Sequence, residues 1–319
     1  MPGPPLVTGA TGFAGSHLVD HLLEHEPRVA AWGHTGGRDV PAGTHPGIEW
    51  TAVDVTDREA VALAIGATRP SRIFHCAGMA DVHAAWQSAT PALRINALGT
   101  HHVLEGVRRA GLDIPVLVVG SALVYQASAA AIDETHPLRP SSPYGISKLA
   151  QEMAALRAEG CRVFLVRPFN HAGPRQGDAY VTSSFARQIA EIEAGLREPV
   201  LRVGNLEARR DITDVRDTVR AYARVVSSGR ERVPYNVCSG TAHRVADLLQ
   251  RLVDGAKVEI RVQTDPDRLR PSDNPVVLGS SARLQRDTGW TPQIPIERTL
   301  DDLLDYWRGV TAGRAAAKP

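Results

Sequence analysis

The segment TGATGFAG near the N-terminus constrains the fold of this chain more than any other feature. It places Gly9, Gly12 and Gly15 between an apolar run, PLVTGA, and an amphipathic pattern, FAGSHLVDHLLEHE. Glycines at a strand-to-helix turn let backbone N–H groups approach a pyrophosphate, and the helix N-terminus favours its negative charge. A glycine triplet alone also occurs in ordinary turns, but here the strand and the helix flank it as a nucleotide site requires. We therefore expect a dinucleotide at this turn, with Thr11 and Phe13 among its contacts.

Short apolar runs alternate with helical patterns through the first half of the chain. The runs lie at residues 5–10, 28–33, 48–55, 71–78, 115–125 and 161–170. Strands that are apolar almost throughout, joined by crossover helices, are typical of a parallel sheet covered on both faces. The sequence therefore predicts an α/β fold, a doubly wound parallel sheet of the Rossmann type.

The alternation ends after Asn170. Loops rich in Gly, Pro and Asp follow, such as HAGPRQGDAY and LRPSDNPVVLG, and the elements between them are fewer and shorter. One apolar run, PYNVCSG, has the character of a strand that rejoins the main sheet. We expect an NAD(P)-binding domain over 1–169, with a returning segment near 212–239, and a smaller mixed α/β substrate lobe over 170–319.

Charge and cysteine content exclude several classes of partner. The formal net charge is +1, so nothing favours binding to nucleic acid or to an anionic membrane surface. No run of about 18 apolar residues predicts a membrane span. The three cysteines are scattered and lack the spacing of a metal site, which fits a reducing compartment. We expect a cytoplasmic protein without a metal.

The segment SSPYGISKLA carries the candidate chemistry. Ser142 and Pro143 are suited to begin a helix, and they put Tyr144 and Lys148 one turn apart on the same face. Such a pair can be no more than a solvated helix face. Ser121, however, follows the fifth predicted strand and reaches the same crevice. The three side chains suit hydride transfer to a carbonyl: Tyr144 donates the proton, Lys148 lowers the pKa of the tyrosine and binds the cofactor ribose, and Ser121 orients the substrate oxygen.

The second predicted strand bears on the choice of cofactor. It ends without the acidic residue that would hold a ribose 2′-hydroxyl and repel a 2′-phosphate. His34, Thr35 and Arg38 follow it and could receive a phosphate, although Arg38 could equally be solvated. The sequence therefore favours NADP(H), with NAD(H) possible.

TGATGFAG, GSALVY and SPYGISK, in this order, resemble the extended short-chain dehydrogenase/reductases over almost the whole chain. Later segments, among them VRPFNHAGPRQ and VGNLEARRDITDVRDTVRAY, are similar to those of GDP-4-keto-6-deoxy-D-mannose reductases. Those enzymes reduce the C4 ketone of the sugar to give GDP-D-rhamnose. The resemblance implies that activity and a GDP-linked 4-keto-6-deoxy sugar as substrate.

The resemblance also implies further site residues. The expected cofactor contacts are Asp54, Val55, Ala77 and Gly78, with Asn96 either a supporting polar group or a buried structural one. The expected substrate contacts are Ser121, Asn170, Arg187, Arg210, Arg270 and Asp273, the arginines because guanidinium groups suit phosphate oxygens.

Departures from related enzymes narrow the reaction. Dehydratases of this family carry acidic residues after the serine, where this chain has Ala122 and Leu123, so dehydration is disfavoured. Arg175 stands where 3,5-epimerising relatives carry a histidine, which disfavours that reaction. A 4-epimerase, or a 4-ketoreductase for another nucleotide sugar, remains an alternative because it uses the same Ser, Tyr and Lys. A non-catalytic cofactor sensor is a further alternative, but it has no need of all three residues.

The resemblance implies an assembly as well. In this family the helix that carries the Tyr and Lys often packs with the preceding helix, here around residues 96–109, into a four-helix bundle about a two-fold axis. We therefore expect a homodimer.

Overall fold

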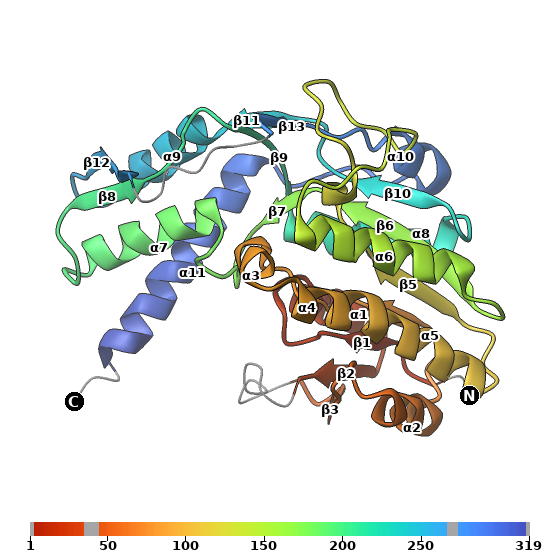
Figure 1. The fold of residues 1–319 in the computed structure, drawn as a ribbon. Coiled ribbons are helices and arrows are strands. Elements are labelled where there is room, and N and C mark those ends of the chain that lie inside the picture. The colour runs from red at the N-terminus through yellow and green to blue at the C-terminus, as the bar shows by residue number, and fades with distance from the viewer. Residues whose placement is uncertain (1–2, 35–44, 267–273, 317–319) are drawn as a thin grey trace.

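The structure is a computed structural model that describes residues 3–34, 45–266 and 274–316. Its main sheet has seven strands, all parallel, in the order β10-β6-β5-β4-β1-β2-β3 (Figure 1). The strands are β1 (Leu6–Thr8), β2 (Val29–Gly33), β3 (Ile48–Ala52), β4 (Ile73–His75), β5 (Pro115–Val119), β6 (Arg162–Pro168) and β10 (Pro234–Val237). The predicted doubly wound parallel sheet is confirmed, and its order turns at β1, where the first crossovers diverge.

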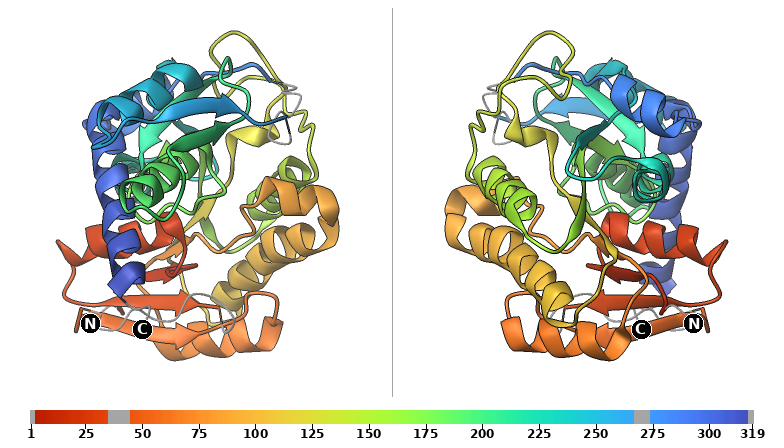
Figure 2. Two further views of the ribbon diagram at one scale, coloured as in Figure 1. Left: turned by 90° about the vertical axis from the view of Figure 1, so that its left-hand side faces the viewer. Right: turned by 90° about the vertical axis from the view of Figure 1, so that its right-hand side faces the viewer.

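Helices cover both faces of this sheet (Figure 2). Helices α1 (Phe13–Leu23) and α8 (Val215–Ser228) pack together on one face, and α2 (Arg58–Thr68), α5 (Gly99–Arg109) and α6 (Pro143–Arg157) cover the other. Each face has its own apolar core, because strands such as β1 and β2 are buried on both sides. α10 (Ala282–Thr288) packs against α8 and β10.

Local sequence signals explain where the key helices begin. The Asp57 carboxylate accepts hydrogen bonds from the backbone N–H groups of Glu59 and Ala60 and caps α2. The Ser142 hydroxyl oxygen accepts from the Gly145 N–H and caps α6, with Pro143 at the first helical position, as the sequence predicts. This cap fixes the start of α6 directly before Tyr144.

The segment between β4 and β5 is more broken than the sequence predicts. One helix is expected, but the chain forms α3 (Val82–Gln87), α4 (Ala89–Ala92), a π-helical segment η1 (Leu93–Leu98) and then α5. A π-helical turn is wider than an α-helical one, so it shifts the helix faces that follow it. Asn96 lies inside this segment and is fully buried.

The remaining elements form a smaller α/β part with a separate core. It contains β7 (Asn170–Ala172), β8 (Val200–Val203), β9 (Arg209–Asp214), β11 (Ala242–Arg244), β12 (Arg261–Thr264), β13 (Val276–Val277), α7 (Val181–Glu193), α9 (Val245–Asp254) and α11 (Ile296–Ala316). β9 pairs with β7, β11 and β13. The division at residues 169 and 170 stays a prediction. No helix in the described part of the chain has the length and apolar character that crossing a bilayer requires.

Candidate active site

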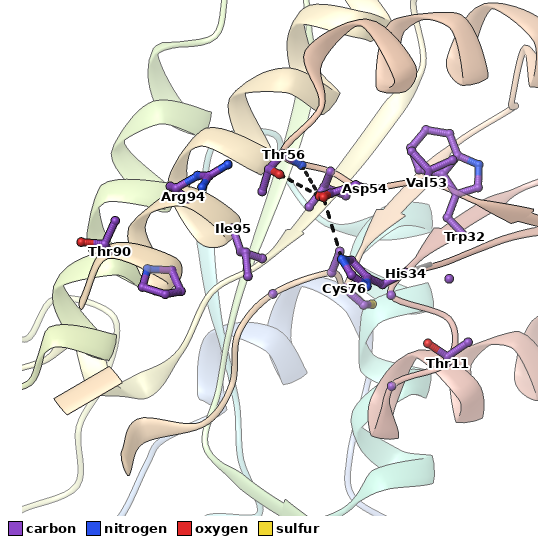
Figure 3. A pocket seen from close by; sticks show the side chains of 17 residues that line it. Thr11, Trp32, His34, Val53, Asp54, Thr56, Cys76, Thr90, Arg94 and Ile95 are labelled. Atoms are coloured by element: carbon purple, nitrogen blue, oxygen red, sulfur yellow. Dashed lines mark hydrogen bonds and ion pairs between the residues drawn. The ribbon is translucent and has the colours of Figure 1, made fainter. Parts of the chain in front are cut away.

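A cavity of about 500 Å³ opens at the carboxyl ends of β1, β2 and β4 (Figure 3). Ligands of doubly wound sheets bind at this edge. Its lining is Gly9, Thr11, Gly12, Trp32, Gly33, His34, Val53, Asp54, Val55, Thr56, Cys76, Ala77, Gly78, Thr90, Pro91, Arg94 and Ile95. Seven of the expected cofactor contacts are in that set: Gly9, Thr11, Gly12, Asp54, Val55, Ala77 and Gly78.

The glycine loop is shaped by close backbone approaches. Gly9 has φ +66°, and a Cβ there would lie 2.7 Å from the backbone of Ala77. A Cβ at Gly15 would lie 2.2 Å from the Gly9 carbonyl oxygen. Gly15 therefore lets α1 approach the loop rather than lining the cavity. Phe13 does not line it either; its ring stacks on His171, with the ring centres 5.5 Å apart.

Asp54 lies just beyond β3, at the rim of the cavity. Its Oδ1 accepts hydrogen bonds from the Thr56 backbone N–H at 2.8 Å and from the Thr56 hydroxyl at 2.9 Å. These bonds, the backbone one first, hold the pKa of Asp54 below its usual value. The fixed, ionised carboxylate suits a donor such as an exocyclic amino group. His34, which also lines the cavity, lies 3.8 Å from the other carboxylate oxygen.

Sequence reasoning missed one wall of the cavity. Thr90, Arg94 and Ile95, from α4 and η1, lie opposite the glycine loop (Figure 3). A signal for them was present, since the helix after a fourth strand begins at the ligand edge of such a sheet. The π-helical segment, which the sequence pattern did not indicate, decides which of its residues face inward. Arg38 and Thr35 lie outside the described residues.

Ser121, Tyr144 and Lys148 come from the end of β5 and the start of α6. Ser121 begins the short 3₁₀ turn η2 (Ala122–Val124), and its hydroxyl oxygen accepts the Leu123 N–H at 3.1 Å. Ser121 lies close enough to Tyr144 to act on the pKa of its phenol. The structure thus brings Ser121 and Tyr144 together at the carboxyl end of β5.

Burial dominates the electrostatics of Tyr144. It raises the pKa of the phenol to about 12, while the Ser121 hydroxyl lowers it and the charge interaction with Tyr180 raises it. The Lys148 Nζ donates to the Val119 carbonyl oxygen at 2.7 Å. That the Lys148 ammonium lowers the pKa of Tyr144 stays a prediction.

Lys148 is buried, with 5% of its surface exposed. Burial lowers the pKa of its ammonium to about 7. A Cβ at Gly78 would stand 3.7 Å from its Nζ, so the amine lies beside a loop that lines the cavity. A lysine in this position can exchange a proton near neutral pH and can donate to a ligand in the cavity.

Asn96 is fully buried, and its side chain is hydrogen-bonded within the protein. Its Oδ1 accepts from the Met79 N–H at 2.8 Å, and its Nδ2 donates to the Met79 carbonyl at 3.2 Å and to the Ser147 hydroxyl at 2.8 Å. The Ser147 hydroxyl in turn donates to the Tyr144 carbonyl. Asn96 therefore joins the loop after β4 to α6.

Two of the expected substrate contacts, Asn170 and Arg210, lie on the smaller sheet. Asn170 is exposed at the start of β7, opposite Ile212 of β9. Arg210 lies two residues earlier on β9 and donates to the carbonyls of Arg209 and Pro275. Burial lowers its pKa. Asn170 and Arg210 thus share one small sheet.

Arg187 is engaged by carboxylates instead. Its guanidinium lies 2.8 Å from Asp178 Oδ2 and 3.6 Å from Glu191 Oε1. A phosphate would have to compete with both acids. Arg270 and Asp273 lie outside the described residues. Across residues 3–34, 45–266 and 274–316, no group of three or more His, Cys, Asp or Glu side chains could hold a metal ion.

Comparison with known proteins identifies relatives over nearly the whole chain. The model of the family described as GDP-mannose 4,6 dehydratase matches residues 6–303. GDP-6-deoxy-D-mannose reductase of Pseudomonas aeruginosa is 36% identical over 308 residues, which cover 94% of this chain and 96% of that protein.

Solved structures agree with this relationship. The structure of RMD from Pseudomonas aeruginosa complexed with NADPH matches with a TM-score of 0.83 and 34% identity, over 97% of this chain and 99% of that one. UDP-glucose 4-epimerase of Thermus thermophilus in complex with NAD matches with a TM-score of 0.83 and 29% identity, over 96% and 99%. The chain belongs to the GDP-mannose 4,6 dehydratase family.

Proposed function

We propose that this protein is an NADPH-dependent 4-ketoreductase that converts GDP-4-keto-6-deoxy-D-mannose into GDP-D-rhamnose. The observation that carries the proposal is the near full-length similarity to GDP-6-deoxy-D-mannose reductase. The site supports it, because Ser121 acts on the pKa of Tyr144 and Lys148 is buried beside Gly78, which lines the cavity.

The cavity fits a dinucleotide. Gly9 and Gly12 present backbone without side chains, and the ionised Asp54 offers an acceptor at the rim. The further cofactor contacts are Thr11, Val55, Ala77 and Gly78, with Arg38 proposed for the 2′-phosphate. We favour NADP(H) because the similar RMD is complexed with NADPH, and we keep NAD(H) as possible because the similar epimerase is complexed with NAD. The cofactor, when bound, supplies the hydride.

Three side chains then divide the remaining work. Tyr144 donates its phenolic proton to the oxygen that forms at C4. Ser121 donates its one hydroxyl hydrogen to that oxygen and stabilises the negative charge that develops on it. Lys148 is held by the Val119 carbonyl, and its amine is proposed to donate to a ribose hydroxyl and to return a proton to Tyr144.

The smaller lobe is proposed to hold the nucleotide sugar. Asn170 and Arg210 lie on paired strands of one small sheet, and their amide and guanidinium groups suit diphosphate oxygens. Arg270 and Asp273 are proposed to complete the nucleotide contacts. Arg187 is the weakest member of the set, because Asp178 and Glu191 already neutralise it.

The chain lacks the acids that other reactions would need. Ala122 and Leu123 follow Ser121 and cannot transfer a proton, which disfavours dehydration. Arg175 donates to Asp20 Oδ2 at 2.6 Å and lies 2.7 Å from His17 Nδ1. Its guanidinium is thus tied to α1 and is no proton donor for 3,5-epimerisation.

We also propose a homodimer. Ile146 and Met153 are seven residues apart on one face of α6 and are 51% and 58% exposed. Leu98 of η1, which packs beside α6, is 51% exposed. Pairing these faces about a two-fold axis would bury an apolar surface that is unusual on a helix facing solvent. A cytoplasmic location remains the prediction of the sequence.

The test is an incubation of the protein with GDP-4-keto-6-deoxy-D-mannose and NADPH, followed by nicotinamide absorbance and by NMR of the product. The proposal predicts one NADPH oxidised for each GDP-D-rhamnose formed. No cofactor oxidation with this or any other nucleoside diphosphate 4-ketohexose would end it.

A 4-epimerase is the second candidate, and the structural similarity to UDP-glucose 4-epimerase favours it. It uses its cofactor catalytically, so it would interconvert C4 epimers without net oxidation of NADPH. The same incubation separates the two candidates. A reductase for another nucleotide sugar would oxidise NADPH with that sugar and not with the GDP-linked one.

A further inference from the structure

His75 is a buried histidine that the proposed proton transfer does not use. It is the last residue of β4, and none of its surface is exposed. Its Nδ1 lies 2.8 Å from the Thr8 hydroxyl at the end of β1. Its Nε2 lies 2.9 Å from the Thr100 hydroxyl of α5. The imidazole therefore connects the end of β1 to α5, the helix that packs against α6.

The surrounding hydrogen bonds determine which nitrogen carries the proton. The Thr100 hydroxyl has one hydrogen, and it donates this to the Asn96 carbonyl at 2.7 Å. Its oxygen accepts from the Gln151 Nε2 at 2.9 Å. With its hydrogen committed, Thr100 can only accept from His75, so the Nε2 is the protonated nitrogen.

The other end follows by the same reasoning. An imidazole protonated at Nε2 has a bare Nδ1, which accepts the hydrogen of the Thr8 hydroxyl. The Thr8 oxygen then accepts the Ala77 backbone N–H at 3.1 Å. All of these hydrogen bonds thus point the same way: Ala77 donates to Thr8, Thr8 donates to His75, and His75 donates to Thr100. Every hydrogen in this chain of bonds has an acceptor.

The two ends of this chain lie at functional parts of the site. Ala77 lines the cofactor cavity. Thr100 is bonded to Gln151 of α6, which is three residues after Lys148, and to Asn96, which holds Ser147 of the same helix. Any tilt of the imidazole would move the cofactor loop and the helix that carries Tyr144 relative to one another.

We propose that His75, fixed as the Nε2-protonated tautomer, is a positioning residue that holds the cofactor-binding loop and the catalytic helix in register. That α6 carries catalytic residues rests on the proposed function. The tautomer of His75 and its contact with the cofactor-binding loop do not depend on that function. A rigid ring with an acceptor at one end and a donor at the other meets both threonines, which a flexible amide side chain reaches only singly.

A charged imidazole would break this arrangement. Both of its nitrogens would be donors, so the Thr8 hydroxyl would have to accept and its hydrogen would lose its partner. Burial opposes that charge and, with the nearby ammonium of Lys148, lowers the pKa of His75 to about 3. One tautomer therefore persists over the whole range in which ordinary histidines titrate.

The tautomer is tested by NMR on the full-length wild-type chain labelled with ¹⁵N at its histidine rings. A His75→Asn variant identifies the His75 signal among the twelve histidines. The proposal predicts a protonated Nε2 and a bare Nδ1 whose shifts stay constant between about pH 5 and pH 9. A protonated Nδ1, or a signal that titrates in this range, would overturn it. If the His75→Asn protein does not fold, an NOE between the ring and Thr100 assigns the signal in the wild type.

Binding measurements test the positioning role without any turnover. Thr8→Val keeps the shape of the side chain but removes the link to Ala77, so NADPH should bind about tenfold more weakly, the size expected for unpaired buried groups. Thr311→Val, at a buried threonine of α11, is the matched control and should leave NADPH binding unchanged. Equal affinities for Thr8→Val and wild type would contradict the proposal.

A double variant separates positioning from simple loss of packing. Thr8→Val added to His75→Phe should weaken NADPH binding no further than His75→Phe alone, because the chain of bonds is already broken. Additive losses would show two independent packing defects and would refute the role of His75. Both readouts use cofactor binding, so they hold even where the chain fails to reduce the proposed sugar.

Discussion

The Nζ of Lys148 donates a hydrogen bond to the carbonyl oxygen of Val119 at 2.7 Å. Val119 ends β5, two residues before Ser121, so this bond ties α6 to the strand that carries the serine. It fixes the separation between the two elements on which Ser121, Tyr144 and Lys148 depend.

Tyr144→Phe should lower kcat by at least about a hundredfold, because it removes the proposed proton donor and leaves the ring in place. NADPH affinity, measured by fluorescence titration, should change little. Tyr306→Phe, at a partly buried tyrosine of α11, is the matched control and should keep full activity. Full turnover by the Tyr144→Phe protein would refute the assigned role.

Lys148 should make stability depend on pH. Its pKa is about 7 in the folded chain and about 10.4 in an unfolded one, so between these values the unfolded chain holds a proton that the folded chain has released. The free energy of unfolding should therefore rise with pH over this window, by at most about 1.4 kcal/mol per pH unit from this group. Below about pH 7 the folded and the unfolded chain both hold the proton. The free energy of unfolding is then lowered by the full cost of burying the ammonium.

Lys148→Met keeps a similar shape without the titrating group. Urea unfolding of the wild type and this variant at several pH values between about 7 and 10 gives the difference in slope. The variant should gain most over the wild type at the low end of the window. Parallel pH dependences for the two proteins would contradict the burial of an amine with a lowered pKa.

Gly78→Ala should weaken NADPH binding roughly tenfold, since overpacking displaces neighbouring groups. The new Cβ would lie 2.9 Å from the Asn96 amide oxygen, which is held by Met79, and 3.7 Å from the Lys148 Nζ. Gly66→Ala is the control: it lies in α2 with nothing within 4 Å of its Cβ, and it should stabilise the helix slightly. Unchanged NADPH binding by Gly78→Ala would show that the loop can move away.

The proposed dimer predicts that Ile146→Glu combined with Met153→Glu yields a monomer in light scattering, because charges would be buried in an apolar interface. Leu63→Glu, on the exposed face of α2, should leave the mass unchanged. A wild-type protein that is monomeric at micromolar concentration would remove the dimer from the account.

The parts of the site that follow from short local patterns were the predictable ones. Gly9 and Gly12 sit at a turn whose strand and helix are visible in the sequence, and both line the cavity. Asp54, which the family resemblance implied, lines it as well. Ser142 and Pro143 mark the start of α6, which fixes Tyr144 and Lys148 on one face.

Features that depend on three-dimensional packing were not predictable. The face of the helix that carries Arg94 and Ile95 depends on a π-helical segment, which a count of 3.6 residues per turn does not reveal. The Val119 carbonyl that holds Lys148 is 29 residues away from it in sequence, and the Thr100 hydroxyl that meets His75 is 25 residues away. Pairings at that separation depend on how the helices pack, which no local pattern encodes.

The most direct test of the central claim follows the hydride itself. Two NADPH samples are prepared, one with deuterium on each face of nicotinamide C4. The protein is incubated with GDP-4-keto-6-deoxy-D-mannose and each of them in turn. The account predicts a GDP-D-rhamnose product with one deuterium at sugar C4 from one of the two cofactors, seen as loss of the C4 proton signal in NMR. A product without deuterium at C4 from either cofactor, or recovery of the ketosugar with NADPH unconsumed, would contradict it.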